Sequence, residues 1–277
     1  MRHAVARVHQ GVRAHWPRLA QFMLPSLCPL CGNLSRQTRY VRGRVHDPLH
    51  HGARAVLCAD CDAAYWNEAR LRCSVCALPL SGMRRALRHA HAHDRYRCDA
   101  CVKAPPAFDA TLALADYRAP LDALALGLKF RARLALGEEF ARRLAQASVD
   151  VIDSADAPAL IVPVPLSRER LIERGYNQAW EIARPLARAL GTRADATLVR
   201  RTLHTAAQSK LDRETRHRNV GRAFALTRAS EGLCGLHVGV VDDVMTSGAT
   251  LDALAQTLKA AGARRVTNFV ALRTPKD

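Results

Sequence analysis

The sequence predicts an α/β protein in which a small cysteine-rich domain precedes a larger domain built on a parallel sheet. Eight of the nine cysteines lie within the first 101 residues. After residue 106 the cysteines almost cease, and apolar segments alternate with amphipathic ones. Hydrophobic residues make up 49% of the 277, which is enough for packed cores and excludes a disordered chain.

The clustered cysteines form four Cys-x-x-Cys pairs, which are Cys28/Cys31, Cys58/Cys61, Cys73/Cys76 and Cys98/Cys101. Two thiolates separated by two residues can face one metal ion, and a second pair completes a tetrahedral set. Consecutive pairing therefore predicts two structural Zn2+ sites, one made by Cys28, Cys31, Cys58 and Cys61 and the other by Cys73, Cys76, Cys98 and Cys101. A cross-braced pairing would use the same eight ligands and stays open.

Two other uses of these cysteines fit the pattern less well. Disulfides are rare in a reducing compartment, and closely spaced pairs make poor long-loop staples. A redox Cys-x-x-Cys motif would need a flanking strand and helix, which the sequence does not indicate here. The histidines between the pairs, such as His50 and His91, are interpreted as solvated loop residues because eight thiolates already suffice.

Charge is unevenly distributed along the chain. The formal net charge is +17, and residues 1–105 hold 17 Lys and Arg against 6 Asp and Glu. Such a field favours phosphate-bearing partners, including nucleic acid. An arginine-rich genome composition is the alternative explanation, and an aromatic content of 5% is low for a base-stacking surface. We expect a basic amphipathic helix over residues 1–26, a double zinc-ribbon domain over 27–105 and the parallel-sheet domain over 106–277.

No run of apolar residues approaches the roughly 18 that a membrane span requires. The arginines near the N-terminus are not followed by an apolar stretch of secretory type. We therefore expect a cytoplasmic protein without a membrane span.

Short apolar segments and amphipathic segments define the larger domain. Strands are predicted at 160–162, 237–241 and 266–272, and helices at 177–190 and 250–261. Residues 120–147 also have helical spacing, with an interruption around 129–133. Strands that are apolar throughout and alternate with helices predict a parallel sheet covered on both faces, and ligands bind such sheets at the carboxyl ends of the strands.

A candidate binding site follows the strand at 237–241. Two carboxylates, Asp242 and Asp243, precede a short loop with hydroxyl groups and Gly248, after which a helix begins. Amides at a helix start form a site for a phosphate group, and paired acids suit a vicinal diol and a divalent cation held mainly by the substrate. The alternative is an ordinary strand–turn–helix connection with Thr250 as the N-cap.

The segment from Val240 to Thr250 closely resembles the ribose-5-phosphate loop of type I phosphoribosyltransferases, which recognise 5-phosphoribosyl-1-pyrophosphate (PRPP). The resemblance implies a type I phosphoribosyltransferase domain that binds PRPP with Mg2+. It implies that ribose and 5-phosphate contact Asp242, Asp243, Val244, Met245, Thr246, Ser247, Gly248, Ala249 and Thr250. Ser247 stands where threonine is commoner in that family and keeps the hydroxyl group.

Three further stretches are similar to the ComF/GntX-type phosphoribosyltransferase-like proteins, which also carry an N-terminal zinc-ribbon region. They are Val162 to Leu166 with Arg170 and Arg174 to Ala179, then Arg201 to Phe224, and Leu128 to Phe130. The resemblance implies pyrophosphate contacts from Lys129, Pro163, Val164, Pro165, Arg170 and Arg174, and a flexible loop with Thr205, Gln208, Arg216 and Asn219. Gly221 precedes Arg222, one residue earlier than that family's pattern, so the register of this loop is open. Solvated helix faces are the alternative for Arg170 and Arg174.

The resemblance implies a role in natural competence, DNA uptake or DNA utilisation, with single-stranded DNA and uptake or helicase proteins as partners. Two alternatives remain, a purine or pyrimidine salvage phosphoribosyltransferase and a non-catalytic adaptor that senses a phosphoribosyl ligand. If the protein is a pentosyltransferase, neither its acceptor nor any catalytic residue is legible in the sequence.

Overall fold

The structure is a computed structural model of the chain, and it describes residues 27–35, 56–66, 70–84, 96–149, 151–152, 156–202, 223–227 and 230–276. The chain divides into two compact units, Met1–Ala64 and Tyr65–Asp277. The helix expected over residues 1–26 lies outside the described residues. The expected domain limits at residues 26 and 105 stay predictions.

The first unit is organised by its cysteines. Leu27 and Leu34 form an antiparallel bridge on either side of Cys28 and Cys31. Helix α2 (Ala59–Tyr65) begins directly after Cys58 and carries two acidic residues in its first turn, where they complement the helix dipole. Cys28, Cys58 and Cys61 are buried.

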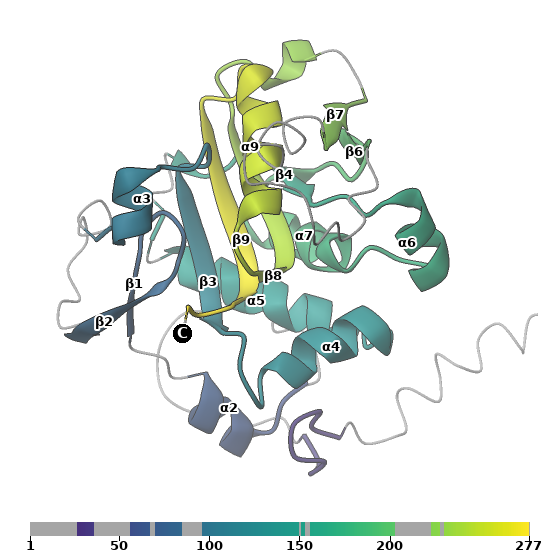
Figure 1. Cartoon of the computed structure of the whole chain (residues 1–277). Coiled ribbons are helices and arrows are strands. Elements are labelled where there is room, and N and C mark those ends of the chain that lie inside the picture. Colours follow the sequence, from purple (N-terminus) through teal and green to yellow (C-terminus); the bar gives the residue numbers. More distant parts are fainter. Residues whose placement is uncertain are drawn as a thin grey trace, which may run out of the picture. The chain divides into compact units, whose positions relative to one another are not determined.

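A five-stranded sheet forms the centre of the second unit (Figure 1). Its order is β3 (Ala110–Asp116), β9 (Arg265–Arg273), β8 (His237–Met245), β4 (Leu160–Pro163) and β5 (Arg193–Ala194). All four pairings are parallel, so the predicted α/β fold class is confirmed. The three predicted strands are β4, β8 and β9, and the last two are longer than expected at nine residues each.

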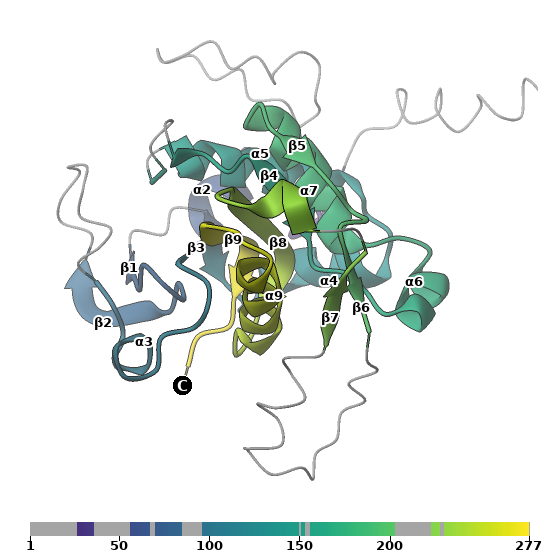
Figure 2. The same ribbon diagram turned by 90° about the horizontal axis from the view of Figure 1, so that it is seen from above.

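Helices cover both faces of this sheet, as the apolar strands require. Helices α5 (Ala135–Val149) and α7 (Gln178–Ala189) pack on one face, and α9 (Ala249–Ala260) packs on the other (Figure 2). Helix α4 (Asp122–Phe130) packs against α5, and the predicted interruption separates the two. The short helix α6 (Arg168–Arg174) follows β4 and ends at Gly175.

Several short elements were not predicted. β6 (Val199–Arg201) pairs antiparallel with β7 (Phe224–Leu226), and the 3-10 helix η2 (Ser230–Leu233) precedes β8. β1 (Arg70–Arg72), β2 (Pro79–Arg84) and α3 (Asp99–Lys103) surround the second group of cysteines. Buried residues of that region belong to the same apolar cluster as β8 and α9, with Cys73, Cys76 and Cys101 in contact with a core that contains Val240 and Leu254.

Candidate functional site

The carboxyl end of β8 presents the two acids that the sequence singled out. β8 does not stop at Val241 as predicted but continues through both acids to Met245, paired with β9 at Asp242↔Val270 and Met245↔Arg273. The sheet therefore holds the acid pair rigidly, and the irregular segment is shorter than expected. We call residues 246–250, which are the turn after β8 and the first two residues of α9, the site loop.

The site loop joins β8 to α9 in a conformation that needs glycine. Gly248 has a φ of +87° and precedes the first residue of α9. The Ser247 hydroxyl accepts a hydrogen bond from the Ala249 amide at 3.3 Å. An open pocket is lined by Asp242, the end of β8, the site loop and Leu251. The positive end of the α9 dipole thus faces a space that can admit an anion.

The two acids lie in different surroundings although they are adjacent. Asp243 is 4% exposed, and its Oδ1 accepts a hydrogen bond from Gln178 Nε2 at 3.3 Å. Its Oδ2 is buried and has no hydrogen-bond partner among the described residues. Burial, and then the negative charge of Asp243, raise the pKa of Asp242 well above its usual value, and the charge of Lys129 opposes that rise. The pair therefore has too little compensating positive charge and suits a cation or hydroxyl donors.

Lys129 and Arg201 lie close enough to Asp242 to interact with its charge, and Arg170 neighbours Arg201. Lys129 at the end of α4 and Arg170 on α6 were both predicted, and Arg201 at the end of β6 was not assigned to binding. Burial lowers the pKa of Arg201, the neighbouring Arg170 lowers it further, and Asp242 opposes both. The Arg201 guanidinium also lies 5.6 Å from the centre of the Phe224 ring. Because Arg201 is one of 42 basic residues in the sequence, no local signal distinguished it.

The end of β4, predicted to contact pyrophosphate, has no free backbone amide to offer at Pro163, Val164 and Pro165. Pro163 and Pro165 have no N–H group, and the Val164 amide donates to the Val241 carbonyl at 2.9 Å. The Val164 carbonyl accepts a hydrogen bond from Asn177 Nδ2 at 3.0 Å. The structure therefore gives these three residues a supporting position beside β8 and leaves their backbone no free donor.

Arg174 is connected to Asp243 through Gln178. Its guanidinium donates to Gln178 Oε1, and Gln178 in turn donates to Asp243. The guanidinium also lies 5.5 Å from the centre of the exposed Phe130 ring. The Tyr176 hydroxyl donates to the Leu128 carbonyl and ties the end of α4 to the segment that begins α7. The predicted loop residues Thr205, Gln208, Arg216 and Asn219 lie outside the described residues.

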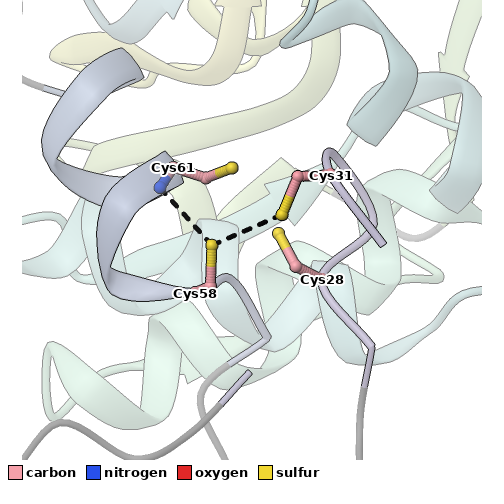
Figure 3. A group of neighbouring side chains, drawn as sticks. All are labelled: Cys28, Cys31, Cys58 and Cys61. Carbon is pink, nitrogen blue, oxygen red and sulfur yellow. Dashed lines mark hydrogen bonds between the residues drawn. The ribbon is translucent and has the colours of Figure 1, made fainter. Parts of the chain in front are cut away.

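The eight predicted metal ligands gather in two groups with the consecutive pairing. The first cluster consists of Cys28, Cys31, Cys58 and Cys61 (Figure 3). The second cluster consists of Cys73, Cys76, Cys98 and Cys101. Within each cluster all four sulfur atoms lie within 4.8 Å of one another.

The donor chemistry of both clusters fits a tetrahedral thiophilic ion. The Cys31–Cys58 and Cys76–Cys98 sulfur separations are 3.5 and 3.6 Å. A tetrahedron with Zn–S bonds of ~2.3 Å has edges of about 3.8 Å. In the second cluster, the hydrogen bond from Cys76 lowers the pKa of Cys73 to about 4, whereas burial raises the pKa of Cys101 to about 12. Each cluster could hold a zinc ion that displaces the shared thiol protons.

The paired acids at a sheet edge, the open loop beside them and the cysteine clusters together define a phosphoribosyltransferase-like protein with a zinc-ribbon region. No protein-family model matches the chain. Curated proteins are nevertheless similar to it in sequence. DNA utilization protein YhgH of Salmonella typhimurium is 32% identical over 253 residues, which cover 91% of this chain and 98% of that protein. Competence protein F of Haemophilus influenzae is 32% identical over 171 residues, covering 61% and 75% of the two chains.

The chain belongs to the ComF family. Competence protein ComFC of Bacillus subtilis is 33% identical over 120 residues. The alignment covers 43% of this chain and 46% of that protein. Among solved structures, adenine phosphoribosyltransferase from Leishmania tarentolae aligns with a TM-score of 0.36 at 14% identity, covering 59% of this chain and 91% of that one. Glutamine PRPP amidotransferase from Bacillus subtilis aligns with a TM-score of 0.36 at 16% identity. The alignment covers 53% of this chain and 30% of that one.

Helices long and apolar enough to cross a membrane do not occur in the described part of the chain.

Proposed function

We propose that the chain binds PRPP with Mg2+ in the pocket lined by Asp242 and the site loop, and that this binding serves the handling of DNA in competence or nutrient use. The observation that carries the proposal is the juxtaposition of undercompensated acids, one with a buried unpaired oxygen, and an open loop at a helix start. A phosphorylated sugar with a free diol supplies both complements at once.

Each part of PRPP has a partner of matching chemistry. The ribose hydroxyls donate to Asp242, which lines the pocket, and to the buried, unpartnered oxygen of Asp243. The 5-phosphate accepts hydrogen bonds from amides and hydroxyls of the site loop. The pyrophosphate lies toward Lys129, Arg170 and Arg201, which balance its charge. Mg2+ is held mainly by the substrate and is favoured by the nearby acids.

If transfer occurs, an acceptor displaces pyrophosphate at the anomeric carbon of ribose. The chain's residues then contribute mainly orientation of the sugar and charge neutralisation of the leaving pyrophosphate. Gln178 holds Asp243 in place through its amide, and Arg174 holds Gln178, so both act on the ribose site through the acid. The acceptor is open.

The DNA-related part of the proposal is supported by the relatives, one named a DNA utilization protein and two named competence proteins. The basic excess of residues 1–105 supports single-stranded DNA as a partner. We further propose that Zn2+ occupies both cysteine clusters and shapes that surface, and that the protein acts in the cytoplasm beside uptake or helicase proteins.

Calorimetry with PRPP and Mg2+ tests the ligand. We expect the wild-type protein to bind and the double variant Asp242→Ala/Asp243→Ala to lose binding while it keeps its circular dichroism spectrum. Asp109→Ala is the matched control, because it removes a carboxylate bonded to Lys259 at the opposite end of the sheet. Equal affinity of the double variant and the wild type would contradict the proposal.

Fluorescence anisotropy with a labelled oligonucleotide tests the DNA partner. The affinity should fall with salt with a log–log slope of about −2 or steeper, as expected when three or more phosphates are neutralised. A slope near zero would remove single-stranded DNA from the proposal and favour protein docking by the N-terminal region. Pyrophosphate release in a panel of bases, nucleosides and oligonucleotides separates DNA-linked transfer from base salvage, since only salvage requires turnover with a free base.

A further inference from the structure

One buried arginine joins the site loop to the second cluster. Arg273 is the last residue of β9 and is 2% exposed. It pairs in register with Met245, the last residue of β8, so its side chain lies where the site loop leaves the sheet. A guanidinium this deeply buried needs several acceptors to offset its lost hydration.

The Arg273 guanidinium donates hydrogen bonds to four backbone carbonyls. Nη1 donates to Met245 O at 3.0 Å, to Thr246 O and to Thr274 O at 2.7 Å. Nε donates to Cys76 O at 2.8 Å, a contact between residues 197 positions apart. The same guanidinium therefore binds the carbonyls of Met245 and Thr246, where the site loop begins, and the carbonyl of Cys76, a ligand of the second cluster.

The orientation of these carbonyls determines where the loop amides point. In a trans peptide the C=O and N–H groups face opposite ways. Because Arg273 draws the Met245 and Thr246 carbonyls toward itself, the N–H groups of Thr246 and Ser247 are turned away from it. Loss of these bonds would release the Thr246 carbonyl, and it would leave the Met245 carbonyl with the Thr274 amide at 2.9 Å as its remaining donor.

Two other contacts connect the second-cluster region with the same loop. The Ala107 amide, just after α3, donates to Asp252 Oδ1 in the first turn of α9 at 2.6 Å. Phe108 is 4% exposed, and its ring lies 3.9 Å from the position of a Cβ atom built on Gly248. Cys76, Phe108 and Met245 belong to one apolar cluster. The chain that leaves the second cluster thus packs directly beneath the loop.

We infer that Arg273 is a positioning residue for the site loop and that, through Cys76, it couples metal occupancy of the second cluster to anion binding at the loop. The identity of that anion rests on the proposed function, and the coupling itself does not. A metal ion bound to the Cys76 thiolate would fix the turn whose carbonyl accepts the hydrogen bond from Arg273. Coupling is reciprocal in binding free energy, so an anion in the loop must also tighten the binding of that metal, which we expect to appear as slower metal release.

Hydrogen–deuterium exchange without ligand tests the positioning role. In Arg273→Met, peptides that cover residues 246–250 should exchange on the order of tenfold faster, the factor that corresponds to about one lost hydrogen bond to a charged group. Arg273→Lys keeps the charge and a donor and should restore part of the protection. Unchanged exchange of residues 246–250 in folded Arg273→Met would overturn the inference.

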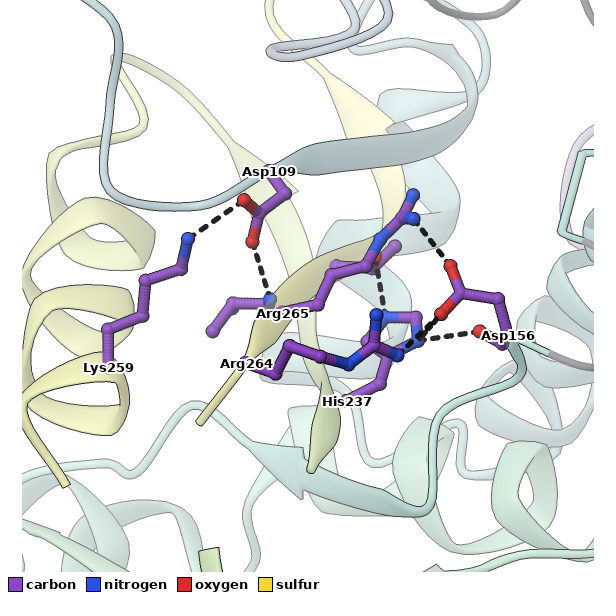
Figure 4. Close-up of polar contacts among 8 residues, drawn as sticks. Asp109, Asp156, His237, Lys259, Arg264 and Arg265 are labelled. Atoms are coloured by element: carbon purple, nitrogen blue, oxygen red, sulfur yellow. Dashed lines mark hydrogen bonds and ion pairs between the residues drawn. The ribbon is translucent and has the colours of Figure 1, made fainter. Parts of the chain in front are cut away.

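Arg265→Met is the matched control. Arg265 begins the same strand at the opposite edge of the sheet, where it is ion-paired with Asp156 at 2.5 Å (Figure 4). Its loss removes an arginine contact of β9 without touching the site loop. Faster exchange of residues 246–250 in this variant as well would indicate general destabilisation and contradict a specific role of Arg273.

Metal release from the wild-type protein tests the coupling even if Arg273 variants fail to fold. A chromogenic chelator should remove metal in two phases, and PRPP with Mg2+ should slow only one of them severalfold. Cys31→Ser, which disables the first cluster, should keep the slowed phase, whereas Cys98→Ser should lose it.

The outcomes separate the two proposals. If calorimetry shows no PRPP binding, the proposed function fails, and the exchange experiment still decides the role of Arg273. If PRPP binds but neither phase of metal release changes, the coupling fails while the proposed function stands.

Discussion

At the scale of single residues, the negative charge of Asp242 lowers the stability of the ligand-free protein. Burial and the charge of Asp243 raise its pKa above the ordinary 3.8. Between the pKa of the unfolded state and the higher pKa of the folded state, this carboxyl is more fully protonated in the folded protein than in the unfolded chain. Stability is therefore lost as pH rises from about 4 through the raised pKa.

Asp242→Asn should accordingly stabilise the ligand-free protein at pH 7, because it removes a carboxylate whose pKa is raised by burial and by the charge of Asp243. The gain should shrink as the pH falls toward 4, and urea unfolding at several pH values measures it. Asp109→Asn is the control with the opposite sign, because Asp109 is paired with Lys259 and accepts the Val266 amide. A destabilised Asp242→Asn protein would contradict this account of the site.

Two glycines provide a second comparison at this scale. Gly248→Ala places a Cβ atom on a residue with φ +87° and directs it toward the Met245 methyl group. The strain lies in the site loop and should lower the free energy of unfolding by about 1–2 kcal/mol. Gly239→Ala instead would meet Ile161 and Phe269 inside the core and should cost about 1–3 kcal/mol. We expect Gly248→Ala to weaken PRPP binding more than stability and Gly239→Ala to do the reverse, as measured by calorimetry and thermal unfolding.

At the scale of elements, β8 begins with a buried histidine and ends with the acid pair. His237 Nδ1 lies 2.6 Å from the Asp156 carbonyl (Figure 4). Its Nε2 lies 2.8 Å from the Thr267 hydroxyl. Burial lowers the pKa of His237, while Asp156 opposes that shift and Arg264 and Arg265 add to it. The folded state thus binds fewer protons than the unfolded state near pH 6.

Stability should therefore fall as the pH drops below about 6.5, the ordinary histidine value, toward the lowered pKa. His237→Gln should be less stable than the wild type at pH 7.5 but should lose this acid sensitivity. Urea midpoints at pH 5.5 and 7.5 test the prediction, which a parallel pH dependence of the two proteins would contradict.

The elements that the sequence predicted are those with a strong local pattern. The apolar runs of β4, β8 and β9 and the 3.6-residue spacing of α5, α7 and α9 were legible. β5, β6 and β7 have two or three residues each, too few for any periodicity, and β3 is diluted by alanine. The acid pair and site loop could be predicted because they are contiguous. Arg201 and Arg273 could not, because their partners are distant in sequence.

At the scale of the whole molecule, the two clusters predict a metal content. Metal analysis of the purified protein should give two zinc ions per chain, since each cluster supplies four thiols within 4.8 Å. Cys234→Ser is the matched control and should retain both ions, because Cys234 is an exposed cysteine outside both clusters. A value of one or none in the wild type would contradict the eight-ligand assignment.

The shared core beneath α9 determines where the chain can be cut. A fragment starting at residue 106 would strip Cys73, Val75, Cys76 and Leu78 from the apolar cluster that contains Leu251 and Leu254. It would also leave the Arg273 guanidinium without its Cys76 acceptor. Such a fragment should aggregate, whereas one starting near residue 65 keeps the whole second compact unit and is the better starting point for crystallisation.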